Sequence, residues 1–212
     1  MVNKSKYQLF LEQVESHMQS PNKLVMEAFN SEYAFIELNS LLNEVCMCIS
    51  CGLPQASITL TNTLLELAMR VSIQYAKGVG IEINENLLEP INYKKKNDKE
   101  RSQNSLSNNI KIAFAMELIT QEQKEFLDKY RKEFRNNFSH ARLKAVEEEK
   151  IPIGSINISE KPCCQIEKSL SEFLPLYGIS LYMSAENNYI KNFLDIDKII
   201  RSIICKINQY GK

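Results

Sequence analysis

One long and almost uniformly apolar stretch limits most strongly what this chain can fold into. Gly52-Leu53-Pro54 is a turn signal with proline suited to the first position of a helix, and Gly78 is a natural helix stop. The apolar residues between these two signals include Ile58, Leu60, Leu64, Leu65, Leu67, Ala68, Val71 and Ile73. A helix that is apolar nearly all round belongs in the middle of a bundle. The sequence therefore predicts an all-α fold around a central helix at residues 54–76.

Further helices are predicted on both sides of this central one. Apolar residues recur at three- and four-residue spacings over residues 3–18, 33–50 and 185–210, and again from about residue 109. Thr120 with Gln123 matches a capping box that would start another helix. Together these segments favour a bundle whose helices run up and down.

The chain is interpreted as a single domain, residues 1–212, with three parts. Residues 1–30 are a helical appendage at the N-terminus, residues 31–145 are the core, and residues 146–212 are a C-terminal extension that ends in a helix. Within the extension, residues 151–158 alternate between apolar and other residues, so a short β hairpin is a local alternative there.

Composition restricts the function class and the cellular compartment. The chain has 26 Lys and Arg against 26 Asp and Glu, so a nucleic-acid site would have to be a local patch. Six cysteines with no secretory signal are typical of reduced cytosolic thiols. No apolar run approaches the roughly 20 residues that span a bilayer. The expectation is a cytoplasmic protein with no membrane contact.

Cysteines crowd the end of the predicted helix at residues 33–50. Cys46, Cys48 and Cys51 could bind zinc if Cys163 and Cys164 supplied distant ligands. The interpretation that we favour is that they are small core side chains, as buried cysteines commonly are. No cofactor or metal is therefore expected.

The chemistry-bearing side chains gather in residues 128–143, DKYRKEFRNNFSHARL. Arg135 is followed at once by Asn136, and His140, one of only two histidines, comes five positions after the arginine. The planar fork of an arginine can hold a phosphate, and a histidine exchanges protons near neutral pH. This is a minimal set for phosphodiester chemistry.

The same stretch has a helical pattern with two polar flanks. Its apolar stripe consists of Leu127, Tyr130, Phe134, Phe138 and Ala141. Arg131, Arg135 and Arg142 line one flank of the stripe, and Asn136 and His140 lie on the other. The pattern predicts a helix that carries the whole motif.

This motif, residues 135–140 with the sequence RNNFSH, resembles that of the HEPN superfamily. A second stretch, residues 53–78, looks like the family's long earlier helix with a Leu-Leu-Glu near its middle. The resemblance covers roughly residues 31–145. It implies an all-α, commonly dimeric domain, of which many members are metal-independent ribonucleases in toxin–antitoxin, abortive-infection and other antiviral systems.

The resemblance implies a role for each residue of the motif. His140 would act as general base or acid, Arg135 would stabilise charge on the phosphate, and Asn136 would orient the site or donate a hydrogen bond. RNA is the implied substrate, with Arg131 and Arg142 as candidate contacts. An antitoxin or a defence-system protein is the implied partner.

Two further features have both a functional and a structural interpretation. Lys94, Lys95 and Lys96 could grip the RNA backbone, or they could belong to a solvated loop. Glu66, set among leucines, could orient Arg135 or His140, or it could pair with Arg70 four residues later.

The spacing of the motif bears on oligomeric state. On a regular α-helix, residues five apart point about 140° away from each other, so Arg135 and His140 would not meet within one chain. A two-fold homodimer with the site at its interface brings both copies of the motif to one cleft. The competing hypotheses are a non-catalytic module that binds nucleotide, RNA or a partner protein, and a helix-end histidine favoured by the helix dipole.

Overall fold

The computed structural model describes residues 5–87, 105–135 and 174–211, and for Arg135 and residues 174–187 it describes the backbone only. Every regular element in these ranges is helical, which confirms the all-α prediction. The α-helices are α1 (Lys6–Gln19), α2 (Lys23–Phe29), α3 (Asn39–Ser50), α4 (Pro54–Gly78), α6 (Leu106–Ala115), α7 (Gln121–Tyr130) and α9 (Leu174–Tyr210). The short elements are the 3₁₀ helices η1 (Ile36–Leu38) and η2 (Glu85–Leu87) and a π-helical turn, η4 (Arg131–Arg135).

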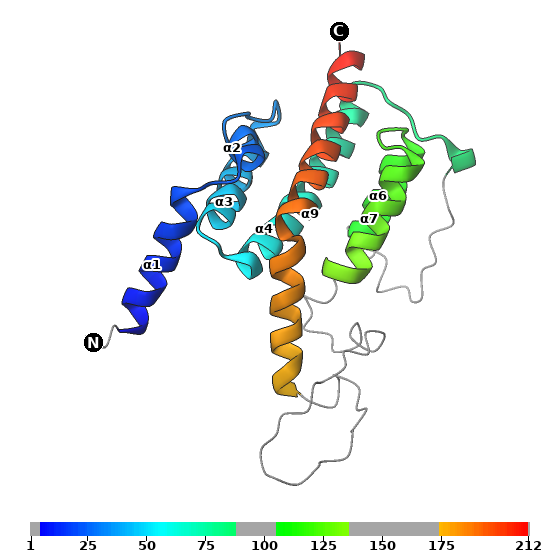
Figure 1. The fold of residues 1–212 in the computed structure, drawn as a ribbon. Helices are drawn as coiled ribbons and strands as arrows, with labels where there is room; N and C mark the ends of the chain where they lie inside the picture. Colours follow the sequence, from blue (N-terminus) through cyan, green and yellow to red (C-terminus); the bar gives the residue numbers. More distant parts are fainter. Residues whose placement is uncertain (1–4, 88–104, 136–173, 212) are drawn as a thin grey trace, which may run out of the picture.

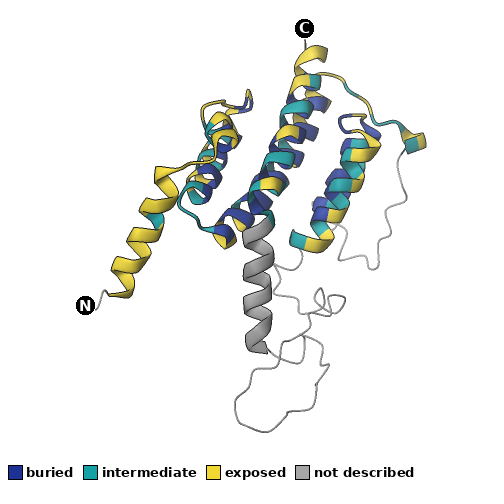
Figure 2. Cartoon of the chain, in the orientation of Figure 1, coloured by how far each residue is buried: buried dark blue, intermediate teal, exposed yellow. Residues whose placement is uncertain are grey.

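The two longest helices, α4 and α9, lie side by side through the middle of the molecule (Figure 1). Helices α2 and α3 cover one side of this pair, and α6 and α7 cover the other. The central position predicted for residues 54–76 is therefore confirmed. Twelve residues of α4 are buried, and the apolar stripe of α9, which includes Phe193, Ile196, Ile200 and Ile203, packs in the same core (Figure 2).

Local signals in the sequence explain several helix ends. Pro54 starts α4 without a side-chain cap, and the capping box of Thr120 and Gln123 is formed at the start of α7. Gly78 is the last residue of α4, but the left-handed conformation belongs to Gly80, whose φ is +82°. The N–H of Ile81 donates to the carbonyl of Ala76. The left-handed residue that ends the helix, a position where glycine is favoured, is therefore Gly80 and not Gly78.

Two predicted helices are interrupted. The one expected at residues 33–50 begins as η1, and α3 starts only at Asn39, whose side chain bonds to both the N–H and the carbonyl of Tyr33. The one expected to carry the whole motif changes from α to π geometry after Tyr130. The hairpin alternative at residues 151–158 lies outside the described residues.

In the predicted N-terminal appendage, residues 1–30, helix α1 extends from the α2–α3 side and contributes no residue to the core, whereas Val25 and Ala28 of α2 are buried in it (Figure 1). The imidazole ring of His17, near the end of α1, lies against Gly52 at the turn between α3 and α4. In the described residues no helix is both long and apolar enough to cross a membrane.

Candidate functional site

Of the predicted site residues, the structure describes Arg131 and the backbone of Arg135, both in η4, and Glu66 on α4. Arg131 is mostly buried and pairs with Asp128, with 3.3 Å between Nη2 and Oδ1. The backbone of Arg135 completes the π turn. Asn136, His140 and Arg142 lie outside the described residues, as do Lys94, Lys95 and Lys96.

A ladder of aromatic rings leads along α7 into the π turn. The ring of Tyr130 is stacked between those of Phe126 and Phe134, at centroid distances of 6.4 and 5.6 Å. Phe134 packs against the core from within η4, and Tyr130 is 2% exposed. Single π turns within helices are rare and often occur at functional sites. This one directly precedes Asn136.

The central helix holds the start of the π turn through a buried hydrogen bond. The hydroxyl of Tyr130 donates to Oδ1 of Asn62 on α4 over 2.7 Å. Burial raises the pKa of Tyr130 well above its ordinary value, so the phenol keeps its proton and acts as a donor. The bond joins two residues 68 positions apart in sequence and fixes where η4 leaves α7.

In the described residues four buried side-chain atoms have no hydrogen-bond partner, and one of them belongs to Asn62. The Nδ2 of Asn62 and the Nδ2 of Asn192 on α9 are both buried without a hydrogen-bond acceptor. Each such donor costs about 1–3 kcal/mol of stability when it is removed from water without a partner. Of the Asn62 amide, the oxygen has a partner in Tyr130 and the nitrogen has none in the described residues.

Glu66 lies one turn beyond Asn62 on α4. Residues four apart point to the same side of a helix, so Glu66 and Asn62 share the face that meets α7 and η4. Glu66 is half-buried and makes at least one polar or electrostatic interaction. Among the ion pairs of the described residues there is none between Glu66 and Arg70, so the helical pairing suggested by their spacing is not formed.

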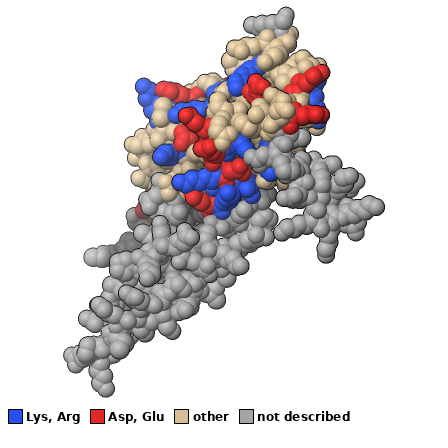
Figure 3. Space-filling model, turned by 90° about the vertical axis from the view of Figure 1, so that its right-hand side faces the viewer, with Lys and Arg blue, Asp and Glu red and all other residues tan. Residues whose placement is uncertain are grey.

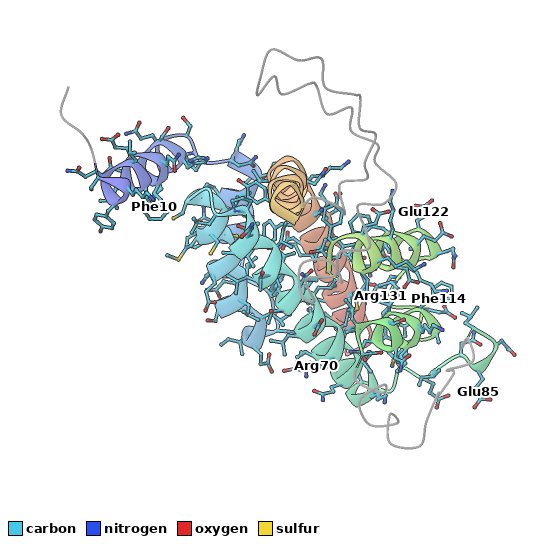
Figure 4. All side chains as sticks on the ribbon, turned by 90° about the horizontal axis from the view of Figure 1, so that it is seen from below. Phe10, Arg70, Glu85, Phe114, Glu122 and Arg131 are labelled. Atoms are coloured by element: carbon cyan, nitrogen blue, oxygen red, sulfur yellow. The ribbon has the colours of Figure 1, made fainter. Side chains whose placement is uncertain are left out.

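The outer surface of α7 and η4 carries charges of both signs. A shallow depression there is lined by Lys124, Glu125, Asp128, Lys129, Lys132 and Glu133. Figure 3 shows this side of the molecule, where basic and acidic side chains alternate. Seen from below, Arg131 and Glu122 lie on the α6–α7 side, beyond the α4–α9 pair (Figure 4). The described part of this face offers no patch of a single sign.

A second polar cluster, which the sequence analysis missed, joins α9 to the segment before α3. The hydroxyl of Tyr33 donates to Oδ1 of Asp197 over 2.6 Å, and Nε of Arg201 donates to Oδ2 over 2.9 Å. Arg201 also donates to the carbonyls of Ala28 and Ser31 and lies over the Tyr33 ring. Burial, followed by the charge of Asp197, raises the pKa of Tyr33 far above its ordinary value. The i,i+4 spacing of Asp197 and Arg201 was the available sequence signal.

The cysteines of α3 differ in their surroundings. Cys46 is 1% exposed, and burial, together with the nearby charge of Asp197, raises its pKa to about 12. It is the small core side chain that the sequence suggested. Cys48 and Cys51 are half-buried free thiols. In the described part of the chain no group of three potential ligands could hold a metal ion, and Cys163 and Cys164 lie outside that part.

Comparison with known protein families, with curated proteins and with solved structures finds no match for this chain. The HEPN resemblance therefore depends on residues 135–140 and on the helical context around them.

Proposed function

We propose that this chain is a metal-independent endoribonuclease of the HEPN type that acts on RNA as a homodimer. The observation that carries the proposal is the π turn at Arg131–Arg135, which is tied to α4 by the buried bond from Tyr130 to Asn62. The helix has left regular α geometry before the motif begins. Single π turns often occur at functional sites, and a two-fold homodimer brings both copies of the motif to one cleft whatever the angle between Arg135 and His140 in one chain.

The proposed reaction is a transfer of the phosphate within the RNA strand. His140 removes the proton from a ribose 2′-hydroxyl, the 2′-oxygen bonds to the adjacent phosphorus, and the bond from phosphorus to the 5′-oxygen breaks. A protonated His140, from the same or the partner chain, gives a proton to the departing 5′-oxygen. Arg135 stabilises charge on the phosphate oxygens and Asn136 orients the group. The products are a 2′,3′-cyclic phosphate and a 5′-hydroxyl.

The candidate RNA contacts differ in whether the structure describes them. Arg131 already pairs with Asp128, so it would have to release that carboxylate before binding a phosphate. Arg142 and the lysines at 94–96 lie outside the described residues and remain proposed contacts on the grounds of sequence alone. The proposed setting is a toxin–antitoxin or antiviral system in the cytoplasm, with an antitoxin or defence protein as partner.

A second candidate function is a partner-binding module without catalytic activity. The alternating charges along α7 and η4 favour it, because RNA backbones bind to surfaces with an excess of positive charge, whereas protein interfaces use both signs. In this case the motif would hold a phosphate or a partner's carboxylate without cleaving anything.

An RNase assay in EDTA separates the two candidates. Wild type would be compared with Arg135→Ala, His140→Ala and the surface control Lys132→Ala, with oligomeric state and product end groups determined on the same samples. The endoribonuclease predicts cuts that leave cyclic phosphate in wild type and in Lys132→Ala, and none in the other two. A folded wild-type dimer that binds RNA or a partner without cutting would support the binding module instead.

A further inference from the structure

Two thiols stand together at the end of α3, in the order Cys48-Ile49-Ser50-Cys51. Three residues turn through about 300° on an α-helix, so the two side chains leave the same face. Cys48 lies in the last turn of α3, and Cys51 is its C-cap with helical backbone angles of φ −85° and ψ 0°. Both are half-buried, and both are free thiols.

A glycine turn with two backbone hydrogen bonds ends the helix directly after Cys51. Gly52 adopts φ +67°, the N–H of Leu53 donates to the carbonyl of Cys48 over 2.9 Å, and that of Gly52 donates to Ile49 over 3.0 Å. This pair of bonds is a Schellman motif. For helical residues three apart the Cα atoms are about 5 Å from each other. That separation lies within the roughly 4.4–6.8 Å range of Cα distances in disulfides. Helical Cβ atoms three residues apart are about 5–6 Å from each other, and a disulfide needs about 3.5–4.5 Å, so the bond requires a local shift of the C-cap residue Cys51.

The surroundings of Cys48 favour its thiol form over the thiolate that attacks a disulfide. Burial raises the pKa of Cys48, and Cys51 and Glu44 raise it further. Cys48 and Cys51 are both half-buried and lie three residues apart at the end of one helix. The other described cysteines lack this combination, since Cys46 is buried in the core and Cys205 is exposed on α9.

We propose that Cys48 and Cys51 are a dithiol modification site, which a small disulfide such as oxidised glutathione converts into an intramolecular disulfide. The thiolate of one cysteine attacks the reagent's S–S bond and releases one small thiolate. The second cysteine attacks the protein sulfur of this mixed disulfide and releases the other. The two protein thiols lose two electrons and two protons, and the reagent becomes two thiols.

The modification would act on the part of the molecule that supports α1. The ring of His17 lies against Gly52, directly after Cys51, and a Cβ at Gly52 would come within 2.7 Å of it. A disulfide across Cys48 and Cys51 therefore covalently locks the turn on which α1 rests. The site does not depend on the ribonuclease proposal, because α3 takes no part in the reaction described above.

Mass spectrometry of the full chain tests the site. In a background of Cys163→Ser and Cys164→Ser, the reduced protein is treated with oxidised glutathione, remaining thiols are alkylated, and the protein is digested and mapped. We expect Cys48 and Cys51 to escape alkylation as one cross-linked pair with no retained glutathione, while Cys46 and Cys205 form no bond to either of them.

Single variants test the exchange mechanism. Cys48→Ser and Cys51→Ser should each trap a glutathione on the remaining cysteine, because the second attack is then absent. Cys205→Ser, the matched control, should still form the pair. Retained glutathione on wild-type Cys48 or Cys51, or reaction of these thiols only after unfolding in denaturant, would overturn the proposal. Mapping of the wild-type pair decides the question even if one variant folds poorly.

Discussion

Two buried tyrosines donate hydrogen bonds of nearly equal length from their hydroxyl groups to the two central helices, but the surroundings of these bonds differ. Tyr33 donates to Asp197 on α9 over 2.6 Å, and Tyr130 donates to Asn62 on α4 over 2.7 Å. Asp197 has a second partner in Arg201, which in turn donates to two backbone carbonyls. Asn62, in contrast, keeps a buried Nδ2 without an acceptor.

The difference indicates what each cluster contributes. A buried polar network whose members are all satisfied fixes one packing arrangement, here of α9 against the segment before α3. A network that leaves a donor without a partner is less favourable than an apolar core of the same shape. The incomplete cluster lies beside η4, where the predicted motif begins. Ser72, on the same helix as Asn62, also has a buried hydroxyl without a partner, so the link between α4 and η4 rests on the bond from Tyr130 to Asn62.

The largest effect in this comparison is expected at Asp197. Asp197→Ala removes the acceptor of both Tyr33 and Arg201 and leaves a partly buried guanidinium without its carboxylate. We expect the free energy of unfolding to fall by about 3 kcal/mol, as when one partner of a buried pair is removed. Urea denaturation followed by circular dichroism measures this change.

Asp195→Ala is the matched control on the same helix. Its carboxylate meets Lys198 at 3.9 Å on the surface, so the change should stay within about 0.5 kcal/mol. Equal losses from Asp195→Ala and Asp197→Ala would mean that the network does not stabilise the packing of α9.

Removing the hydroxyl of Tyr33 should lower stability more than removing that of Tyr130, and both losses should be smaller than the loss in Asp197→Ala. Tyr33→Phe removes a hydrogen bond to a carboxylate and is expected to cost about 2 kcal/mol. Tyr130→Phe removes a bond to a neutral amide and is expected to cost about 1 kcal/mol. The ring is retained in both variants, so denaturation curves compare the hydroxyls alone. A larger loss for Tyr130→Phe would reverse the ranking of the two clusters.

Replacing both partners at once sharpens the comparison. Asn62→Leu with Tyr130→Phe removes the bond and the unsatisfied Nδ2 together, and we expect the double variant to come within about 1 kcal/mol of wild type. If the pair sets the position of η4, RNA cleavage should fall although stability is kept. The counterpart, Tyr33→Phe with Asp197→Leu, leaves Arg201 without its carboxylate and should stay strongly destabilised. If the two double variants had similar free energies of unfolding, the two tyrosine clusters would not differ in how much they stabilise the fold.

The sequence predicted the elements that depend on local patterns. The central position of α4 followed from apolar residues on all its sides, and the start of α7 followed from Thr120 and Gln123. The bond from Tyr33 to Asp197 joins residues 164 positions apart, and no periodicity encodes such a pairing. The change to π geometry was hidden because Tyr130 and Phe134, four apart, fit one apolar stripe in either kind of helix.

The candidate site could be predicted less completely than the fold. Residue types alone pointed to Arg131 as an RNA contact, but its orientation depends on Asp128 three residues earlier. Glu66 and Arg70 have the spacing of a helical ion pair that is not formed. Spacing shows which side chains are neighbours on a helix, whereas tertiary contacts determine which neighbour each one binds.

The smallest effect concerns Arg131 and Asp128. Asp128→Asn weakens an ion pair whose side chains are 20% and 29% exposed, and we expect a loss of about 0.5 kcal/mol in stability. Its value lies in the second measurement, the binding of RNA at several salt concentrations. If Arg131 contacts phosphate, releasing it from Asp128 should tighten binding and steepen the salt dependence. If Arg131 only braces the start of η4, RNA affinity should stay unchanged in Asp128→Asn, and Arg131→Ala should lower stability without altering the salt dependence.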